Sequence, residues 1–261
     1  MLISDAVLLG GGVGKRYSDS SEGSSGTPKQ FELLEGIPVF VHALKALEST
    51  GQFRTFVLVF PESFLEEARV ALDSYVSPAL RERCLLVAGG EQRQDSSRRG
   101  LRALETQDPL PTRVIIHDAC RPFLSPAFLE RMREALEDRS YGAWIPTVPV
   151  VETIKSVRSK QVVETVDRSS LHRVQTPQIF EYGVLRSLFE NLENDRNLQF
   201  TDDASICEYY GIPVGVFGGD ERNIKLTYGF EMEMLRILFQ GQTHSSLEAA
   251  CDSGSATTFT A

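Results

Sequence analysis

The stretch AVLLGGGVGKR, residues 6–16, decides the fold class of this chain of 261 residues. Residues 6–9 form a continuous apolar run, which is typical of a buried strand. The run leads directly into a glycine-rich turn, and apolar residues at helical spacing follow from Ile37 to Leu47. Residues 55–60 form the next strand-like run. The order of strand, turn, helix and strand predicts the start of a β-α-β unit.

The same alternation continues through the first half of the chain. Residues 84–88 and 114–117 have the composition of further strands, and helical patterns separate them. Ser125 followed by Pro126 is typical of the N-cap and the first residue of a helix. Strands that alternate with helices predict an α/β fold with a doubly wound, mainly parallel sheet of the Rossmann-like kind.

The pattern changes between residues 144 and 180, where strand-like segments show little helical periodicity. Residues 153–157 and 161–166 flank a polar turn, so we expect a protruding β-hairpin arm over about residues 148–172. Helices resume afterwards, one of them capped by Thr201-Asp202 and the last striped by apolar residues from Phe230 to Leu238. Residues 214–217 and 224–226 read as strands.

The chain is predicted to form a single domain over residues 1–240. Residues 18–27 are rich in serine and glycine, and residues 241–261 are polar, small and unpatterned. Neither segment has the apolar content that offsets the entropy of ordering, so we expect both to be disordered.

The composition limits the function classes. A net charge of −9 argues against general binding to nucleic acid or to an anionic membrane, because both attract basic surfaces. The four cysteines are far apart and form no C-x-x-C pair, which is typical of reduced cysteines. The N-terminus has no signal-peptide pattern, and no window reaches the ~18 apolar residues of a membrane span. We therefore expect a cytoplasmic protein.

The glycine-rich turn is a candidate phosphate site, because glycines let backbone N–H groups close around phosphates. A tight turn without a ligand is the alternative. Lys15, Arg16 and Lys29 favour the phosphate interpretation, since they concentrate positive charge in an acidic protein. The spacing fits neither a P-loop, because Arg16 follows Gly14-Lys15, nor a dinucleotide fingerprint, because Tyr17 stands where a small residue is required.

Two more polar turns follow predicted strands, GGEQRQDS at residues 89–96 and HDACRP at residues 117–122. The carboxyl ends of parallel strands form one crevice, so these turns should line the same cleft as the glycine-rich turn. Asp118 would position a metal ion or a ribose hydroxyl there, or form a local ion pair with Arg121. We expect His117 to be a hydrogen-bonded structural residue, because no second histidine lies at metal-ligand spacing.

Nine blocks in this order, GGGVGKR, PKQF, GGEQRQDS, HDACRP, ETIK, TVDR, QTPQ, TDDAS and NIK, resemble the 2-C-methyl-D-erythritol 4-phosphate cytidylyltransferases of the non-mevalonate isoprenoid pathway. The resemblance covers about residues 5–239. It implies a homodimeric nucleotidyltransferase that uses Mg²⁺, transfers CMP from CTP to this polyol phosphate and releases CDP-methylerythritol and pyrophosphate. It also implies that the arm clasps the second subunit.

The matched motifs imply roles for individual residues. Those implied in catalysis are Arg16, Lys29, Asp118 and Lys225, with Mg²⁺ held by Asp118 or through the phosphates of CTP. Those implied in CTP binding are Gly10, Gly11, Gly12, Gly14, Lys15, Gly90, Arg93 and Ser96. Those implied in binding the acceptor are Arg121, Thr153, Arg168 and Thr201, and Arg168 is expected to serve the partner's site.

The chain departs from the family pattern in a longer loop between Arg16 and Pro28, and in Gly10-Gly11, which stands where two small residues, often alanines, are expected. A ribitol-5-phosphate cytidylyltransferase is an alternative, since it shares the glycine, HDA-x-RP, QTPQ and NIK blocks, although TVDR and TDDAS look more like the methylerythritol enzymes. A non-catalytic nucleotide-binding protein is a second alternative. The attacking phosphomonoester is already ionised at pH 7, so the reaction requires no strong general base.

Overall fold

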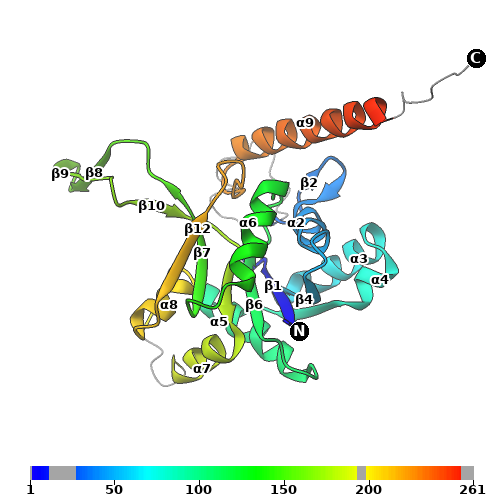
Figure 1. Cartoon of the computed structure of the whole chain (residues 1–261), viewed down its shortest axis with the longest axis horizontal. Helices are drawn as coiled ribbons and strands as arrows, with labels where there is room; N and C mark the ends of the chain where they lie inside the picture. The colour runs from blue at the N-terminus through cyan, green and yellow to red at the C-terminus, as the bar shows by residue number, and fades with distance from the viewer. Residues whose placement is uncertain (1, 12–27, 193–197, 254–261) are drawn as a thin grey trace, which may run out of the picture.

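One mixed sheet forms the centre of the molecule. The structure is a computed structural model that describes residues 2–11, 28–192 and 198–253, with side chains up to residue 241. The sheet has eight strands in the order β10-β7-β11-β6-β1-β4-β5, and β12 also pairs with β7 (Figure 1). These strands are β1 (Ser4–Leu9), β4 (Phe53–Phe60), β5 (Cys84–Ala88), β6 (Arg113–Asp118), β7 (Ala143–Pro149), β10 (His172–Val174), β11 (Gln178–Glu181) and β12 (Val214–Gly218).

The pairing confirms the predicted mainly parallel sheet. β1 pairs in parallel with both β4 and β6, β4 pairs in parallel with β5, and β12 pairs in parallel with β7. Two short strands run the other way, since β11 is antiparallel to β6 and β7, and β10 is antiparallel to β7. The carboxyl ends of β1, β5 and β6 therefore open at the same edge of the sheet.

Helices cover both faces of the sheet. One face packs against α2 (Val39–Glu48), α3 (Leu65–Tyr75), α4 (Pro78–Glu82) and α6 (Pro126–Glu137). The other face packs against α5 (Arg93–Ala103), α7 (Tyr182–Leu192) and α8 (Ala204–Tyr209). Short 3₁₀ turns, η1 (Glu62–Phe64) and η2 (Leu104–Thr106), and the two-residue strands β2 (Leu33–Leu34) and β3 (Ile37–Pro38) complete this part of the chain.

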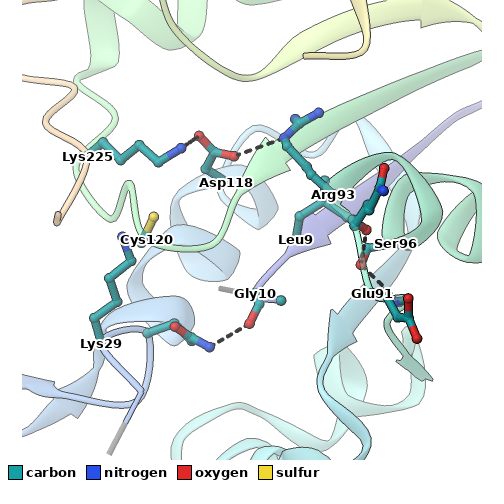
Figure 2. Close-up of a pocket in the computed structure, with 13 residues that line it drawn as sticks. Leu9, Gly10, Lys29, Glu91, Arg93, Ser96, Asp118, Cys120 and Lys225 are labelled. Carbon is teal, nitrogen blue, oxygen red and sulfur yellow. Dashed lines mark hydrogen bonds and ion pairs between the residues drawn. The ribbon is translucent and has the colours of Figure 1, made fainter. Parts of the chain in front are cut away.

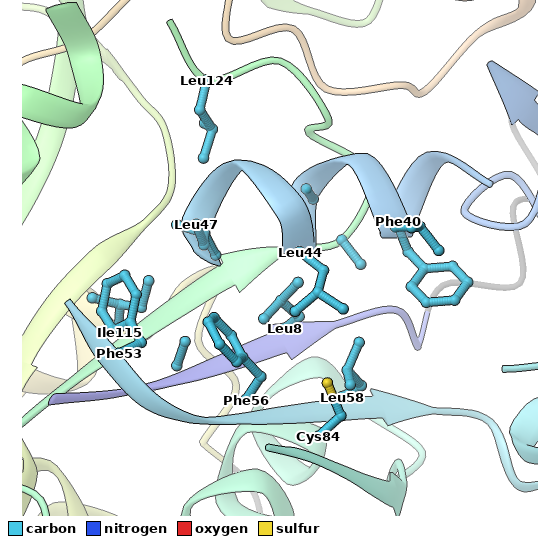
Figure 3. Close-up of a cluster of buried hydrophobic side chains, with 14 of the residues drawn as sticks. Leu8, Phe40, Leu44, Leu47, Phe53, Phe56, Leu58, Cys84, Ile115 and Leu124 are labelled. Atoms are coloured by element: carbon cyan, nitrogen blue, oxygen red, sulfur yellow. The ribbon is translucent and has the colours of Figure 1, made fainter. Parts of the chain in front are cut away.

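The continuous apolar run in β1 follows from this double cover. Successive side chains of a strand point to opposite faces, so Ala6 and Leu8 enter one core cluster while Val7 and Leu9 enter the other. Figure 3 shows Leu8 in the first cluster, close to Leu44 of α2. A strand between two helical layers has no polar face, and its sequence does not alternate.

The predicted hairpin arm is confirmed. β8 (Ile154–Arg158) pairs antiparallel with β9 (Gln161–Val166), and the hairpin projects from the body of the molecule (Figure 1). Ser159 and Lys160, the two residues between the strands, have φ angles of 47° and 65°. Two successive positive φ angles are the requirement of the tight hairpin turn that matches strand twist.

One predicted strand is wrong. Residues 224–226 form no strand, because Leu226 instead buries its side chain in a third core cluster and bonds through its N–H to the carbonyl of Cys120. The last helix, α9 (Gly229–Ser253), includes the first residues of the segment 241–261 for which we expected disorder. Residues 12–27, with the serine-rich stretch, and residues 254–261 lie outside the described residues.

The helices in the described ranges do not include one with the length and apolar character needed to cross a bilayer.

Candidate functional site

A cavity of about 370 Å³ opens where β1, β5 and β6 end, and we call it the first cavity. The predicted residues Gly10, Gly11, Lys29, Gly90, Arg93, Ser96, Asp118 and Lys225 all line it (Figure 2). A second cavity of about 410 Å³ contains the predicted residues Arg121 and Thr201. Arg93, Asp118 and Lys225 line both cavities, so these three side chains mark the place where the cavities meet.

Gly10 is required by close packing beneath the first cavity. A Cβ atom on this residue would lie 2.2 Å from the ring of Phe60. The Gly10 N–H bonds to the carbonyl of Val59 at 2.8 Å, and its carbonyl accepts a hydrogen bond from the Gln30 side chain at 2.5 Å (Figure 2). These bonds hold the end of β1 in place, and with it Gly11, which also lines the cavity.

Helix α5 presents its first turn to the first cavity. Ser96 Oγ accepts a hydrogen bond from the N–H of Gly90 at 3.1 Å, which ties the loop after β5 to the helix. The N–H of Gln92 donates to the Asp95 carboxylate at 3.3 Å and closes the start of the helix. A helix N-terminus favours anions, because its N–H groups and dipole point outward.

Asp118 lies at the centre of a cluster of cations drawn from distant parts of the chain. Its Oδ2 is 2.9 Å from Lys225 Nζ, and its Oδ1 is 3.9 Å from Arg93 Nε (Figure 2). Its Oδ2 is also 3.4 Å from Arg121 Nε. Burial alone would raise the pKa of this carboxyl, but Lys225, Arg93 and Arg121 outweigh burial and hold the pKa far below its usual range. Asp118 is therefore a fixed negative charge. The local pair with Arg121 that the sequence suggested is present as one part of this larger cluster.

His117 is a structural residue, as predicted. It is fully buried, its Nε2 lies 3.1 Å from the carbonyl of Arg121, and its Nδ1 lies 2.9 Å from Thr176 Oγ1. Since a carbonyl only accepts, Nε2 carries the proton and Nδ1 accepts from the Thr176 hydroxyl. Thr176 Oγ1 accepts in turn from the N–H of Asp118 at 3.0 Å. Burial lowers the pKa of His117 to about 4. The neutral ring thus holds the backbone of Asp118 in position.

Arg93 lines both cavities and also has a buried partner. Its Nη1 pairs with Asp203 Oδ2 at 2.5 Å. Burial opposes the charge on Arg93, but Asp203 and Asp118 outweigh it and raise the pKa of the guanidinium. Arg93 therefore borders both substrate-sized cavities and is not confined to the first.

The remaining predicted residues fall into two groups. Thr153 and Arg168 are exposed on the arm and are not among the residues that line the two cavities; Arg168 donates a hydrogen bond to the carbonyl of Val151. Gly12, Gly14, Lys15 and Arg16 lie outside the described residues, so their predicted roles remain predictions.

Sequence reasoning missed several residues of both cavities. Gln30, Gln92 and Cys120 line the first cavity, and burial raises the pKa of the Cys120 thiol. The QTPQ and TDDAS blocks contained a signal for the second cavity, because Gln175, Thr176, Gln178, Asp202 and Ser205 all line it.

The described residues contain no cluster of three His, Cys, Asp or Glu side chains suited to hold a metal ion. Asp118 is the carboxylate that lines both cavities. Its Oδ1 is 3.9 Å from Arg93 Nε, whereas its Oδ2 is 2.9 Å from Lys225 Nζ. Mg²⁺ commonly binds through one or two carboxylates together with substrate phosphates. The donor set fits a metal held in that way, with Asp118 as the protein ligand.

Comparison with known proteins identifies the family. The profile of the 2-C-methyl-D-erythritol 4-phosphate cytidylyltransferases matches residues 5–239. The protein of that name from Carboxydothermus hydrogenoformans is 34% identical over 233 residues, which cover 89% of this chain and 94% of the relative. A crystal structure of 4-diphosphocytidyl-2C-methyl-D-erythritol synthase superposes with a TM-score of 0.72 at 27% identity, covering 92% of this chain and 99% of that one.

Some relatives are longer. The bifunctional enzyme IspD/IspF of Solidesulfovibrio magneticus is 38% identical over 232 residues, which cover 88% of this chain but 55% of that protein. The chain thus spans about half the length of such relatives. The extent of the profile match, the similarity to full-length relatives and the shared fold agree with one another, and they establish that this chain belongs to the 2-C-methyl-D-erythritol 4-phosphate cytidylyltransferase family.

Proposed function

We propose that this chain transfers CMP from CTP to 2-C-methyl-D-erythritol 4-phosphate and releases pyrophosphate. The observation that carries the proposal is the junction of two cavities at Arg93, Asp118 and Lys225. A transferase that joins two substrates requires two adjoining sites, with charged groups where the reacting phosphates meet.

The first cavity is assigned to CTP. Its volume of about 370 Å³ suits a small-molecule ligand, and it combines the glycine-rich end of β1, the first turn of α5 and the side chain of Lys29. Backbone N–H groups at a helix N-terminus favour phosphate, and Lys29 adds a positive charge on the opposite wall (Figure 2). Arg16 and Lys15 are proposed to complete the triphosphate site.

The second cavity is assigned to the acceptor. Arg121 lines it and is fixed by a hydrogen bond from Nη1 to the carbonyl of Asn223 at 2.7 Å. Thr201, Gln175 and Ser205 supply polar groups for the hydroxyls of a polyol. We propose that Thr153 and Arg168 reach this site from the arm of a partner subunit.

The reaction is an in-line displacement. A phosphate oxygen of the acceptor forms a bond to the α-phosphorus of CTP, the bond to the β-phosphate oxygen breaks, and pyrophosphate leaves with that electron pair. Lys29, Lys225 and Arg93 would stabilise the charge that develops on the transferred group. Mg²⁺, when bound through the triphosphate and Asp118, would supply further charge neutralisation.

No protein base is needed for this step, because the attacking phosphate is already ionised near pH 7. His117, the histidine next to Asp118, is buried and neutral and holds the backbone in place. The role of the protein is therefore to position two phosphorylated substrates and to neutralise their charge.

We further propose that residues 1–240 form one domain and that the chain is a homodimer joined by its arm. The central eight-stranded sheet supports the first proposal, because it includes both β1, near the start of the chain, and β12, which ends at Gly218. Support for the second comes from Val157, Val162 and Val163, which are more than half exposed on the hairpin. Apolar side chains gathered on a two-stranded hairpin favour contact with a partner. Buried free thiols at Cys84, Cys120 and Cys207 are typical of a cytoplasmic protein.

Measuring pyrophosphate release from CTP with a panel of acceptors tests the proposal. We expect turnover with 2-C-methyl-D-erythritol 4-phosphate, much less with ribitol 5-phosphate or glycerol 3-phosphate, and loss of turnover when Mg²⁺ is chelated. Preference for ribitol 5-phosphate would instead identify a ribitol-phosphate cytidylyltransferase. A protein that CTP protects against heating but that releases no pyrophosphate with any acceptor would be a nucleotide-binding protein.

A further inference from the structure

Asp203 occupies a helix cap position without capping the helix. It precedes α8, where an aspartate commonly accepts a hydrogen bond from the first turn, but its side chain makes no such bond. Its neighbour Asp202 performs that function, because Asp202 Oδ1 accepts from the N–H of Ser205 at 3.1 Å. The Asp203 carboxylate is fully buried and points elsewhere.

The partner of Asp203 is Arg93, which lies 110 residues earlier in the chain. Asp203 Oδ2 is 2.5 Å from Arg93 Nη1, and Arg93 Nε is 3.9 Å from Asp118 Oδ1. Arg93 lines both cavities, whereas Asp203 is not among the residues that line either of them. The buried carboxylate thus binds the guanidinium without itself bordering either cavity.

A second buried carboxylate shows what a structural ion pair looks like in this protein. Asp5 accepts from Arg54 Nη2 at 2.6 Å through one oxygen, and from Arg54 Nε and the N–H of Thr55 through the other. Both oxygens of Asp5 are satisfied. By contrast, Oδ1 of Asp203 is buried without a hydrogen-bond partner among the described residues. An unsatisfied buried oxygen weakens a fold, so stability alone does not account for the placement of Asp203.

We infer that Asp203 is a positioning residue for the transfer reaction, acting through Arg93. It keeps the guanidinium at the junction of the two cavities and 3.9 Å from Asp118, instead of in a closer pair with it. Without the Asp203 charge, the flexible Arg93 side chain would turn to Asp118, the next carboxylate within reach. That movement would withdraw a cation from the reacting phosphates and occupy Oδ1 of Asp118, the residue proposed to hold Mg²⁺. This inference rests on the proposed cytidylyl transfer.

The test compares Asp203→Asn with Asp5→Asn, since both remove the charge of a fully buried aspartate from a partly exposed arginine. Asp203→Asn is expected to lower kcat about 10- to 100-fold with a change in KM for CTP below about threefold, because a misplaced group near the reacting atoms costs rate more than binding. Asp5→Asn, far from both cavities, should lose thermal stability and keep kcat within about twofold.

A double-mutant cycle separates positioning from a general effect on the fold. In an Arg93→Gln background, Asp203→Asn should change kcat by less than about threefold, because the side chain through which it acts is gone. If Asp203→Asn alone does not fold, the kcat of the double variant is still compared with that of Arg93→Gln. The double variant is expected to fold, because it removes both charges of the pair and leaves neither of them without a partner.

The inference would be overturned if Asp203→Asn retained the kcat of Asp5→Asn, or if it lowered kcat equally with and without Arg93. A wild-type protein that released no pyrophosphate from CTP and 2-C-methyl-D-erythritol 4-phosphate would contradict the proposed function itself. A wild-type protein that turns over while Asp203→Asn matches Asp5→Asn would contradict only the role of Asp203.

Discussion

At the scale of single residues, the site depends on charges that neutralise one another only in part. Lys225, Arg121 and Arg93 surround one buried carboxylate, Asp118. Lys29 lies on the side of the first cavity away from Arg93 (Figure 2). Positive charge that a buried carboxylate holds in place is available to a phosphate with little rearrangement, which is the condition for electrostatic stabilisation of a transition state.

Lys29→Ala is expected to lower kcat on the order of 10²- to 10³-fold, because it removes one preorganised charge beside the transferred group. Thermal stability should change little, since the side chain is partly exposed at the cavity wall. Steady-state pyrophosphate release at saturating CTP measures the effect, with Lys45→Ala on α2 as the control. Turnover close to that of the wild type would remove Lys29 from the catalytic residues.

His117 provides a pH-dependent prediction. Burial lowers its pKa from 6.5 to about 4, so the unfolded chain binds a proton on this ring at a higher pH than the folded chain does. Its contribution to stability is therefore complete above about pH 6.5 and is lost as the pH falls toward 4, by on the order of 3 kcal/mol. Asp118, Arg121 and Lys225 face the same ring and shift its pKa by smaller amounts.

Urea unfolding between pH 4 and 7 measures this contribution. The unfolding free energy of the wild type should fall more steeply with decreasing pH than that of His117→Gln, while His172→Gln, a change at an exposed histidine, should keep the wild-type slope. Equal slopes for the wild type and His117→Gln would show that the ring is not neutral in the folded protein.

At the scale of elements, α5 is the helix that carries the site, and its distance from the sheet is set by Gly100. A Cβ atom at this position would lie 2.5 Å from Val7 Cγ1 and 3.1 Å from Val59 Cγ2. The glycine therefore lets the helix approach β1 and β4 closely. Since Arg93 and Ser96 belong to the first turn of the same helix, its position also fixes theirs.

Gly100→Ala is expected to destabilise the protein by about 1–3 kcal/mol, because the core must shift to admit a methyl group. Gly183→Ala in α7 is the matched control, since its Cβ would meet no atom within 4 Å, and it should be neutral or stabilising by up to about 1 kcal/mol. Thermal or urea unfolding of both variants measures the difference. A Gly100→Ala variant as stable as Gly183→Ala would show that α5 is free to move away from the sheet.

At the scale of the whole molecule, the arm explains how residues far from the cavities could serve a site. Thr153 and Arg168 flank the hairpin of β8 and β9, which projects from the body (Figure 1), and neither is among the residues lining the two cavities of their own chain. In the proposed dimer, the arm of one subunit would bring these side chains to the second cavity of the other. Each site would then combine Lys29 from one chain with Arg168 from its partner.

Mixing two inactive variants tests this crossed arrangement. Lys29→Ala and Arg168→Ala homodimers should each be nearly inactive. Random subunit exchange makes about half of the dimers heterodimers with one intact site of two, so activity should return to about a quarter of the wild type. Pyrophosphate release after exchange measures this recovery. Activity no greater than the sum of the two variants would place Arg168 in the site of its own chain.

Much of this protein was accessible from the sequence by itself. The apolar run of β1, the alternation of strands and helices and the turn between β8 and β9 are set by neighbouring residues, so periodicity and turn chemistry predicted the sheet and the arm. The ordered motifs likewise identified eight residues that line the first cavity and, besides the three that it shares with the second cavity, Arg121 and Thr201 in the second.

Only the tertiary structure decided which side chains face one another across the chain. The pair of Arg93 with Asp203 and the contact of Thr176 with both His117 and Asp118 depend on strand order and on where α5 and α8 lie against the sheet. The same holds for Leu226, whose short apolar segment looks like a strand locally but packs as part of a core. Local sequence reports the conformation of a segment, whereas the partner of a buried charge 110 residues away is chosen by how the segments pack.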